Sequence, residues 1–158
     1  MSIVLETTRM TDVQKRFGGT VGQEGDAGTY LEWLCLRGGD ATEGWVLWLK
    51  SDEMDAGTVG SFQWQRVRHA AKFDERCGVL SKTGKVELPI PLGLGMQEAK
   101  LFHVLGHPTA RHGNTVLYVH EHMGEDQQGP FTTLNTLSVV IRDGKVVTID
   151  VLKVSFAD

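Results

Sequence analysis

Two histidines four residues apart, His103 and His107, are the first residues in this sequence that could do chemistry. In a continuous helix this spacing places both imidazole rings on one face, as in many zinc sites. Gly106 and Pro108 bracket His107, however, and glycine followed by proline ends a helix. The sequence therefore predicts a helix that ends near Leu105, and no metal site at this histidine pair.

A second histidine pair, His120-Glu121-His122, lies in a stretch that is typical of a β-strand. Residues two apart on a strand share a face, so these rings could act together, and His112 precedes them. The pattern specifies no third metal ligand. We therefore expect solvated histidines at a strand end. A small ligand-binding or metal-binding protein that uses this His-rich second half remains the alternative function.

Other signals for catalysis are weak. Acidic clusters at 51–57 and 124–130 are typical of solvated hairpin loops, and they lack the alternating oxygen ligands of a calcium loop. The glycines of 18–25 follow a predicted helix, whereas a phosphate-binding loop must precede one. No G-x-S-x-G or Walker sequence is present. We therefore expect a protein that is not an enzyme and needs no cofactor.

Composition narrows the class of partner. The chain has 158 residues, of which 41% are hydrophobic and 23% charged, as in a soluble globular protein. The net charge is −4 and the Lys and Arg residues are scattered, so nucleic acid is not expected as a partner. No apolar run approaches the roughly 20 residues of a transmembrane helix. We expect another protein as the partner and no transmembrane segment.

The two cysteines indicate the compartment. Cys35 follows a strand-like run, and Cys77 lies in a polar segment where a buried free thiol would be out of place. A disulfide accounts for both positions, and it would contribute roughly 3 to 4 kcal/mol by closing a long loop. Two unpaired cysteines of a cytosolic protein are the alternative. We expect a periplasmic or secreted protein whose signal segment is absent from this chain.

An internal repeat dominates the sequence. The windows Thr7–Gly18 and Gly95–Gly106 align without a gap, and they match Val13 with Leu101. Each window predicts a short amphipathic helix that ends at glycine. A turn-rich stretch and several strands follow each helix, and Asp143-Gly144 predicts a hairpin in the second half.

This order predicts the fold class and the organisation of the chain. We expect an α+β fold in which two tandem helix-plus-antiparallel-sheet repeats form one continuous sheet with helices on one face. Residues 1–80 would form the first repeat, 81–91 the linker and 92–158 the second repeat, all within one compact domain.

The second window carries a family resemblance. Leu94-Gly-Met-Gln-Glu-Ala-Lys-Leu-Phe-His-Val-Leu-Gly-His-Pro-Thr109, followed by Gly113-Asn-Thr-Val-Leu-Tyr118, resembles the G-M-x-x-x-x-V-x-x-x-L-G-x-P…Y signature of two families. These are the SmpA/OmlA (BamE-like) envelope proteins and the tandem-repeat β-lactamase inhibitory proteins. In the first half, Thr7-Thr8 replaces Gly-Met. The resemblance implies a non-catalytic extracytoplasmic protein that binds another protein, such as an inhibitor, an immunity protein or an envelope-associated protein.

Aromatic residues on the predicted strands indicate where a partner would bind. Strand alternation places Trp45, Leu47 and Leu49 on one face and Trp48 on the other. Exposed aromatic side chains supply much of the binding energy in protein interfaces. Packing of these residues on each other or under loops is the alternative. We expect a partner-binding surface on the helix-free face, made by Tyr30, Glu32, Trp48, Lys50, Tyr118 and His120.

Overall fold

The computed structural model describes residues 3–26, 29–39, 44–51, 57–67, 75–80, 86–126 and 129–157. Within these residues the first half of the chain forms α1 (Met10–Phe17), β1 (Val21–Asp26), β2 (Thr29–Gly39), β3 (Gly44–Ser51), β4 (Val59–Val67) and β5 (Gly78–Val79). The second half forms α2 (Glu98–Leu105), β6 (Ala110–His112), β7 (Thr115–Asp126), β8 (Gly129–Arg142) and β9 (Lys145–Ala157). Most of the acidic segment 51–57 and part of 124–130 lie outside the described residues.

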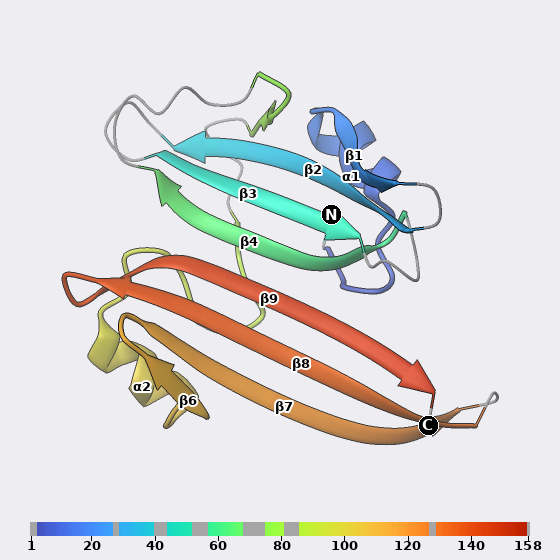
Figure 1. Cartoon of the computed structure of the whole chain (residues 1–158). Helices are drawn as coiled ribbons and strands as arrows, with labels where there is room; N and C mark the ends of the chain where they lie inside the picture. The colour runs from blue at the N-terminus through green and yellow to red at the C-terminus, as the bar shows by residue number, and fades with distance from the viewer. Residues whose placement is uncertain are drawn as a thin grey trace.

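The strands form one nine-stranded sheet (Figure 1). Its order is β1-β2-β3-β4-β9-β8-β7-β6, and β5 pairs with the edge of β2. Each half is an antiparallel meander, and the halves join where β4 pairs antiparallel with β9 over Ser61–Gln65 and Thr148–Leu152. The predicted hairpin is present, because Asp143 and Gly144 both have positive φ and connect β8 to β9. The sheet is therefore continuous across the two halves.

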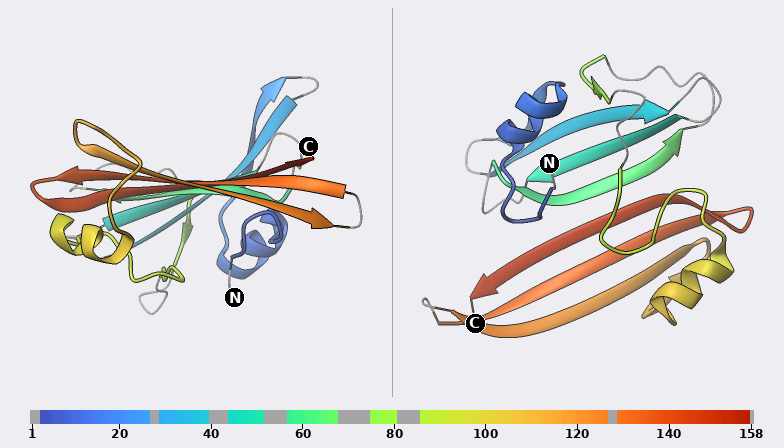
Figure 2. Two further views of the ribbon diagram at one scale, coloured as in Figure 1. Left: turned by 90° about the horizontal axis from the view of Figure 1, so that it is seen from below. Right: turned by 180° about the vertical axis from the view of Figure 1, so that it is seen from behind.

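The predicted α+β class, with helices on one face, is wrong. Of the residues that the structure describes, 61% are in strands and 13% in helices, so the fold is mostly antiparallel β-sheet. Each helix has only eight residues, and α1 and α2 lie at opposite ends of the sheet (Figures 1 and 2). The helical pattern was read correctly, but Gly18 and Gly106 keep both helices short. Strands β8 and β9 extend further than the alternation in the sequence indicated.

The backbone around the two helices repeats closely. The first helical N–H of α1, at Met10, donates to Gly57 O at 2.8 Å, and that of α2, at Glu98, donates to Gly144 O at 2.9 Å. The accepting carbonyls lie just before β4 in the first half and just before β9 in the second. The spacing between equivalent residues is therefore 88 along the helices and 87 along these strands, as the differences 98 − 10 and 144 − 57 show.

The structure also corrects one detail of the repeat alignment. In the second half, Gly95 has φ of 83° and its N–H donates to Val146 O. In the first half, Glu6 has this conformation and makes this type of bond: its φ is 61° and its N–H donates to Val59 O. Glu6, and not Thr7, therefore occupies the place of Gly95, whereas Thr8 matches Met96, since their carbonyls accept from Val59 N–H and Val146 N–H. A non-glycine residue in this region of φ is strained by roughly 1 kcal/mol.

The Glu6 side chain offsets this strain with contacts to the other half. Its carboxylate lies 2.7 Å from Lys153 Nζ, and it accepts a hydrogen bond of 2.9 Å from Ser155 Oγ. Both partners belong to β9. The N-terminal segment of the first half is thereby attached to the last strand of the second half.

The hydrophobic core shows which face of the sheet is covered. One row of paired residues crosses the sheet from β2 to β7, and every member is buried: Leu36, Leu47, Trp64, Ile149, Val139 and Val116. Met10 and Val13 of α1 and Leu101 of α2 join this row in one cluster. We call this side the packed face and the other side the open face. Because the cluster draws on both halves, they share one core.

The predicted linker, 81–91, lies partly outside the described residues. Its described part, 86–91, contains no helix or strand, and Val86 and Leu88 pack against the core.

Candidate functional site

The predicted partner-binding residues do not share one face, which corrects their grouping. Trp48 and Lys50 lie on the open face, as expected, because they alternate with the buried Leu47 and Leu49. The register of β2 and β7 places the remaining residues on the side of the packed face: Tyr30, Glu32, Tyr118 and His120.

The reason differs between the two strands. On β2, the open-face positions are taken by Trp33 and Cys35, because Cys35 must face its disulfide partner. On β7, Val116 is the buried core residue, and Tyr118 follows it on the same face. The Tyr118 hydroxyl donates to the carbonyl of Gly106 at the end of α2, at 3.3 Å. Desolvation by partial burial raises the pKa of this phenol.

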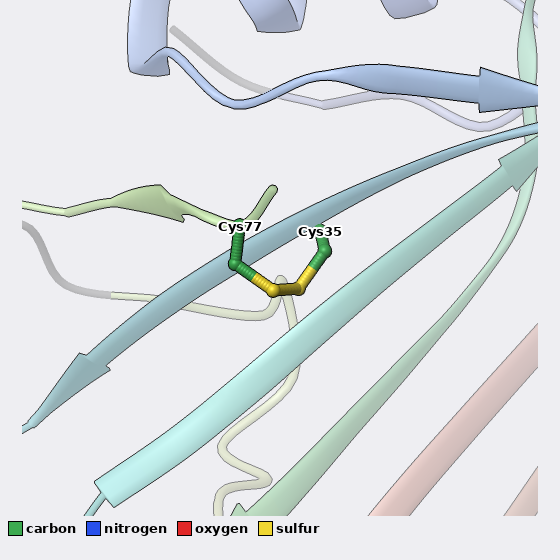
Figure 3. Close-up of a disulfide and its surroundings, with 2 residues drawn as sticks. All are labelled: Cys35 and Cys77. Atoms are coloured by element: carbon green, nitrogen blue, oxygen red, sulfur yellow. A yellow bond between two sulfur atoms is a disulfide. The ribbon is translucent and has the colours of Figure 1, made fainter. Parts of the chain in front are cut away.

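The predicted disulfide between Cys35 and Cys77 is present (Figure 3). The two Cα atoms are 4.5 Å apart, and the bridge closes a loop with a sequence separation of 42 residues. Both cysteines are buried and form a small cluster with Val46 on the open face, against which Trp33 and Trp48 pack. The disulfide thus fixes the segment around Cys77 beside β2, where β5 pairs with this strand.

Next to this disulfide the open face carries two tryptophans and a shallow depression. The Trp33 and Trp48 rings meet edge to face with centroids 5.5 Å apart, and the Arg76 guanidinium lies 4.6 Å from the centroid of Trp33. These side chains take part in lining an open depression of about 490 Å³. We call it the tryptophan depression, and its lining residues are Gln23, Glu24, Trp33, Trp48, Lys50, Gln63 and Arg76.

A glycine on β1 makes room for one of these rings. Gly22 pairs with Trp33, and a Cβ built at Gly22 would lie 2.1 Å from the indole. No other residue type would let the ring lie in this place. The sequence contained this signal, since Gly22 falls inside a strand, where glycine often marks the close approach of another group.

The open face of the second half carries an apolar patch that the sequence interpretation missed. Val119 and Met123 of β7 are 40% and 73% exposed, and Leu152 and Phe156 of β9 are 40% and 50% exposed. Two rows connect them across β8, one from Val119 through Thr136 to Leu152 and one from Met123 through Thr132 to Phe156. The apolar alternation of β9 was visible in the sequence, but not which of its two faces was exposed.

A polar strip separates the apolar patch from the tryptophan depression. It follows the junction of β4 and β9, where the Gln63 amide donates to the Asp150 carboxylate at 2.9 Å. Ser61 lies beside this pair on the same face. The open face therefore has an apolar end, a polar middle and an aromatic end that carries two cations.

The histidines of the second half do not gather. His103, His107, His112, His120 and His122 are all exposed. In the part of the chain that the structure describes, no group of three or more His, Cys, Asp or Glu residues could hold a metal ion. No helix among the described residues is long and apolar enough to cross a membrane.

Comparison with known proteins gives no relative from which to read a function. No family model, no curated protein and no solved structure matches this chain.

Proposed function

We propose that this protein is a non-catalytic protein-binding module whose open sheet face occupies a partner protein, as an inhibitor, an immunity protein or an envelope-associated protein. The observation that carries the proposal is the apolar patch of Val119, Met123, Leu152 and Phe156. Scattered apolar residues are normal on a protein surface, but several that share one open sheet face favour an interaction site.

The layout of the open face supports the same proposal. An apolar area beside a polar strip and an aromatic cluster resembles the core and rim of protein interfaces. Trp48 and Lys50, which we proposed from the sequence, lie on this face. The proposed surface no longer includes four of the residues expected from the sequence, because the strand register places them on the side of the packed face: Tyr30, Glu32, Tyr118 and His120.

The compartment belongs to the proposal as well. The disulfide favours a periplasmic or secreted protein, because such bonds persist in oxidising compartments. The resemblance of the second window to extracytoplasmic binding proteins points in the same direction, although no relative supports it independently.

The test uses charge reversal on the patch. We expect a variant with Met123→Glu and Phe156→Glu to retain its fold, because both side chains are exposed, and to lose at least tenfold in affinity for the partner, since carboxylates would be buried unpaired in the interface. A control with Val4→Glu and Ile90→Glu changes apolar residues that are 52% and 39% exposed and lie outside the sheet.

The partner would be captured from envelope and medium fractions of the source cells with immobilised wild-type protein. Titration with the purified partner then compares the affinities of the wild type, the patch variant and the control variant. Equal affinity of the patch variant and the control variant would overturn the proposal that this face binds.

A further inference from the structure

Three features meet at the aromatic end of the open face. The tryptophan depression, the cation over Trp33 and the disulfide involve adjacent residues, because Arg76 precedes Cys77 and Trp33 lies two residues from Cys35 on the same strand face. The arrangement is that of a built site for part of a ligand.

The charge of this site is opposite to that of the protein. Among the described residues that line the depression, Lys50 and Arg76 accompany one carboxylate, Glu24, so this part of the lining is net positive, whereas the chain as a whole carries −4. Asp150, beside the depression, is already engaged by Gln63. Lys50 is also the direct cross-strand neighbour of Trp33. A carboxylate at this place would meet two cations, and an apolar group next to it would meet indole rings.

The depression also lies in line with the apolar patch. Leu152, Ser61, Lys50 and Trp33 pair in succession across four strands. With strands about 4.8 Å apart, Leu152 and Trp33 are roughly 14 Å from each other. One continuous segment of a bound protein can therefore reach both. A shallow open depression suits side chains of a protein better than a free small molecule, which binding sites usually enclose.

We propose that the tryptophan depression receives an acidic side chain of the partner protein together with a neighbouring aromatic side chain, and that the Cys35–Cys77 disulfide builds this site by holding Arg76 over Trp33. The inference rests on the proposed function, because it names what the open face recognises. Besides the disulfide, a backbone bond from Thr20 N–H to Arg76 O, of 3.0 Å, holds this segment. Reduction of the disulfide would leave this bond, the short β5 ladder and the bond from Leu80 N–H to Arg37 O, of 2.9 Å.

The direct test uses capped dipeptides as probes. We expect N-acetyl-Glu-Phe-amide, at millimolar concentration and low salt, to shift the indole N–H resonances of Trp33 and Trp48 saturably, and to leave those of Trp45 and Trp64, on the packed face, unchanged. Single Trp→Phe variants assign the four resonances. N-acetyl-Gln-Phe-amide should bind about fivefold more weakly, because each exposed ion pair contributes up to about 1 kcal/mol. Equal binding of the two peptides would overturn the acidic specificity.

Variants test the role of Arg76 and of the disulfide. Arg76→Gln should lower the preference for Glu over Gln to the part that Lys50 supplies, whereas Arg142→Gln, at the exposed end of β8, should keep the full preference. Reduction with dithiothreitol should move the Trp33 resonance. It should also lower the affinity for the Glu peptide towards that for the Gln peptide. An unchanged preference in Arg76→Gln, or in the reduced protein with its fold retained by circular dichroism, contradicts the proposal.

The partner assay separates this inference from the proposed function. Arg76→Gln could bind the partner as tightly as wild type while the Met123→Glu, Phe156→Glu variant does not. In that case the proposed contact with an acidic side chain is wrong and the open face remains the binding surface. If all variants bind the partner equally, the proposal that the open face is the binding surface is wrong.

Discussion

The two halves of this protein share a backbone plan but differ on the open face. In both, a short helix ends at a glycine, Gly18 or Gly106, with nearly the same φ of 75° and 77°. In the first half, the disulfide and the two tryptophans cover part of the open face, where Val46 is buried. In the second half, it displays Met123, Phe156 and their neighbours to solvent.

This difference distinguishes the features that determine the fold from the side chains that can vary on it. The helix ends and the buried rows are equivalent in the two halves because backbone geometry and the shared core require them. The side chains that point to the open face are not needed for the backbone geometry or for the core. One half can therefore hold tryptophans and cations where the other holds aliphatic residues. The following predictions test this comparison.

The disulfide should produce the largest effect, and chiefly in the first half. Replacing Cys35 and Cys77 by serine should lower the free energy of unfolding by about 4 kcal/mol, from the entropy of closing the loop in the unfolded chain. Urea unfolding measures the total. Amide hydrogen exchange should show lost protection in β2 and β5 and much less in β7 and β8. Equal loss in both halves would mean that the comparison fails.

The paired helix residues should show that the halves nevertheless share one core. Leu101→Ala should cost about 3 kcal/mol and Val13→Ala about 2 kcal/mol, since both side chains are fully buried and leave cavities. Each variant should unfold in a single transition by circular dichroism and by tryptophan fluorescence. Two separated transitions would instead make each half its own folding unit.

The junction between the halves should respond to charge. Gln63→Asp places a second carboxylate opposite Asp150 and should cost about 1 kcal/mol, because like charges directly opposite each other on a sheet repel. Adding Asp150→Gln should restore the stability, since the pair is then merely exchanged. A double variant as unstable as the single one would show that each position depends on other contacts.

Tyr118 should give a small effect that appears only at alkaline pH. Desolvation raises the pKa of its phenol in the folded protein, so the unfolded chain loses this proton first as the pH rises. Its contribution to stability is therefore complete below the ordinary tyrosine pKa of about 10 and is lost as the pH rises through the folded pKa. The stability difference between wild type and Tyr118→Phe should decline in this range. Tyr30→Phe, at an exposed tyrosine, is the control.

Local signals in the sequence predicted the parts of the structure that local chemistry decides. Glycine after an amphipathic window ended both helices, Asp143-Gly144 formed the hairpin, and the polar setting of Cys77 indicated the disulfide. Strand alternation also gave correctly which residues of one strand share a face. It did not show which face would be covered, because that depends on the neighbouring strands and on where Cys77 folds back.

For the same reason the sequence misplaced part of the site. Tyr118 and His120 have the polarity of surface residues, yet they share a face with the buried Val116 at the periphery of the core. Val119 and Leu152 have the hydrophobicity of core residues, yet they face solvent. Side-chain hydrophobicity gives an average tendency to be buried, and at the margins of a sheet the position on the strand outweighs it.

The junction of β4 and β9 has a consequence for how a duplicated chain differs from a dimer. With the spacing of 87 between equivalent strand residues, Gln63 and Asp150 are counterparts, and they are also direct partners across the junction. They therefore lie on the pseudo-two-fold axis that relates the halves. In a symmetric pair of identical subunits the residue on such an axis meets its own copy, so an aspartate would oppose an aspartate. A single chain is free of this restriction, and here it places an amide donor against a carboxylate at the one position where a homodimer could not.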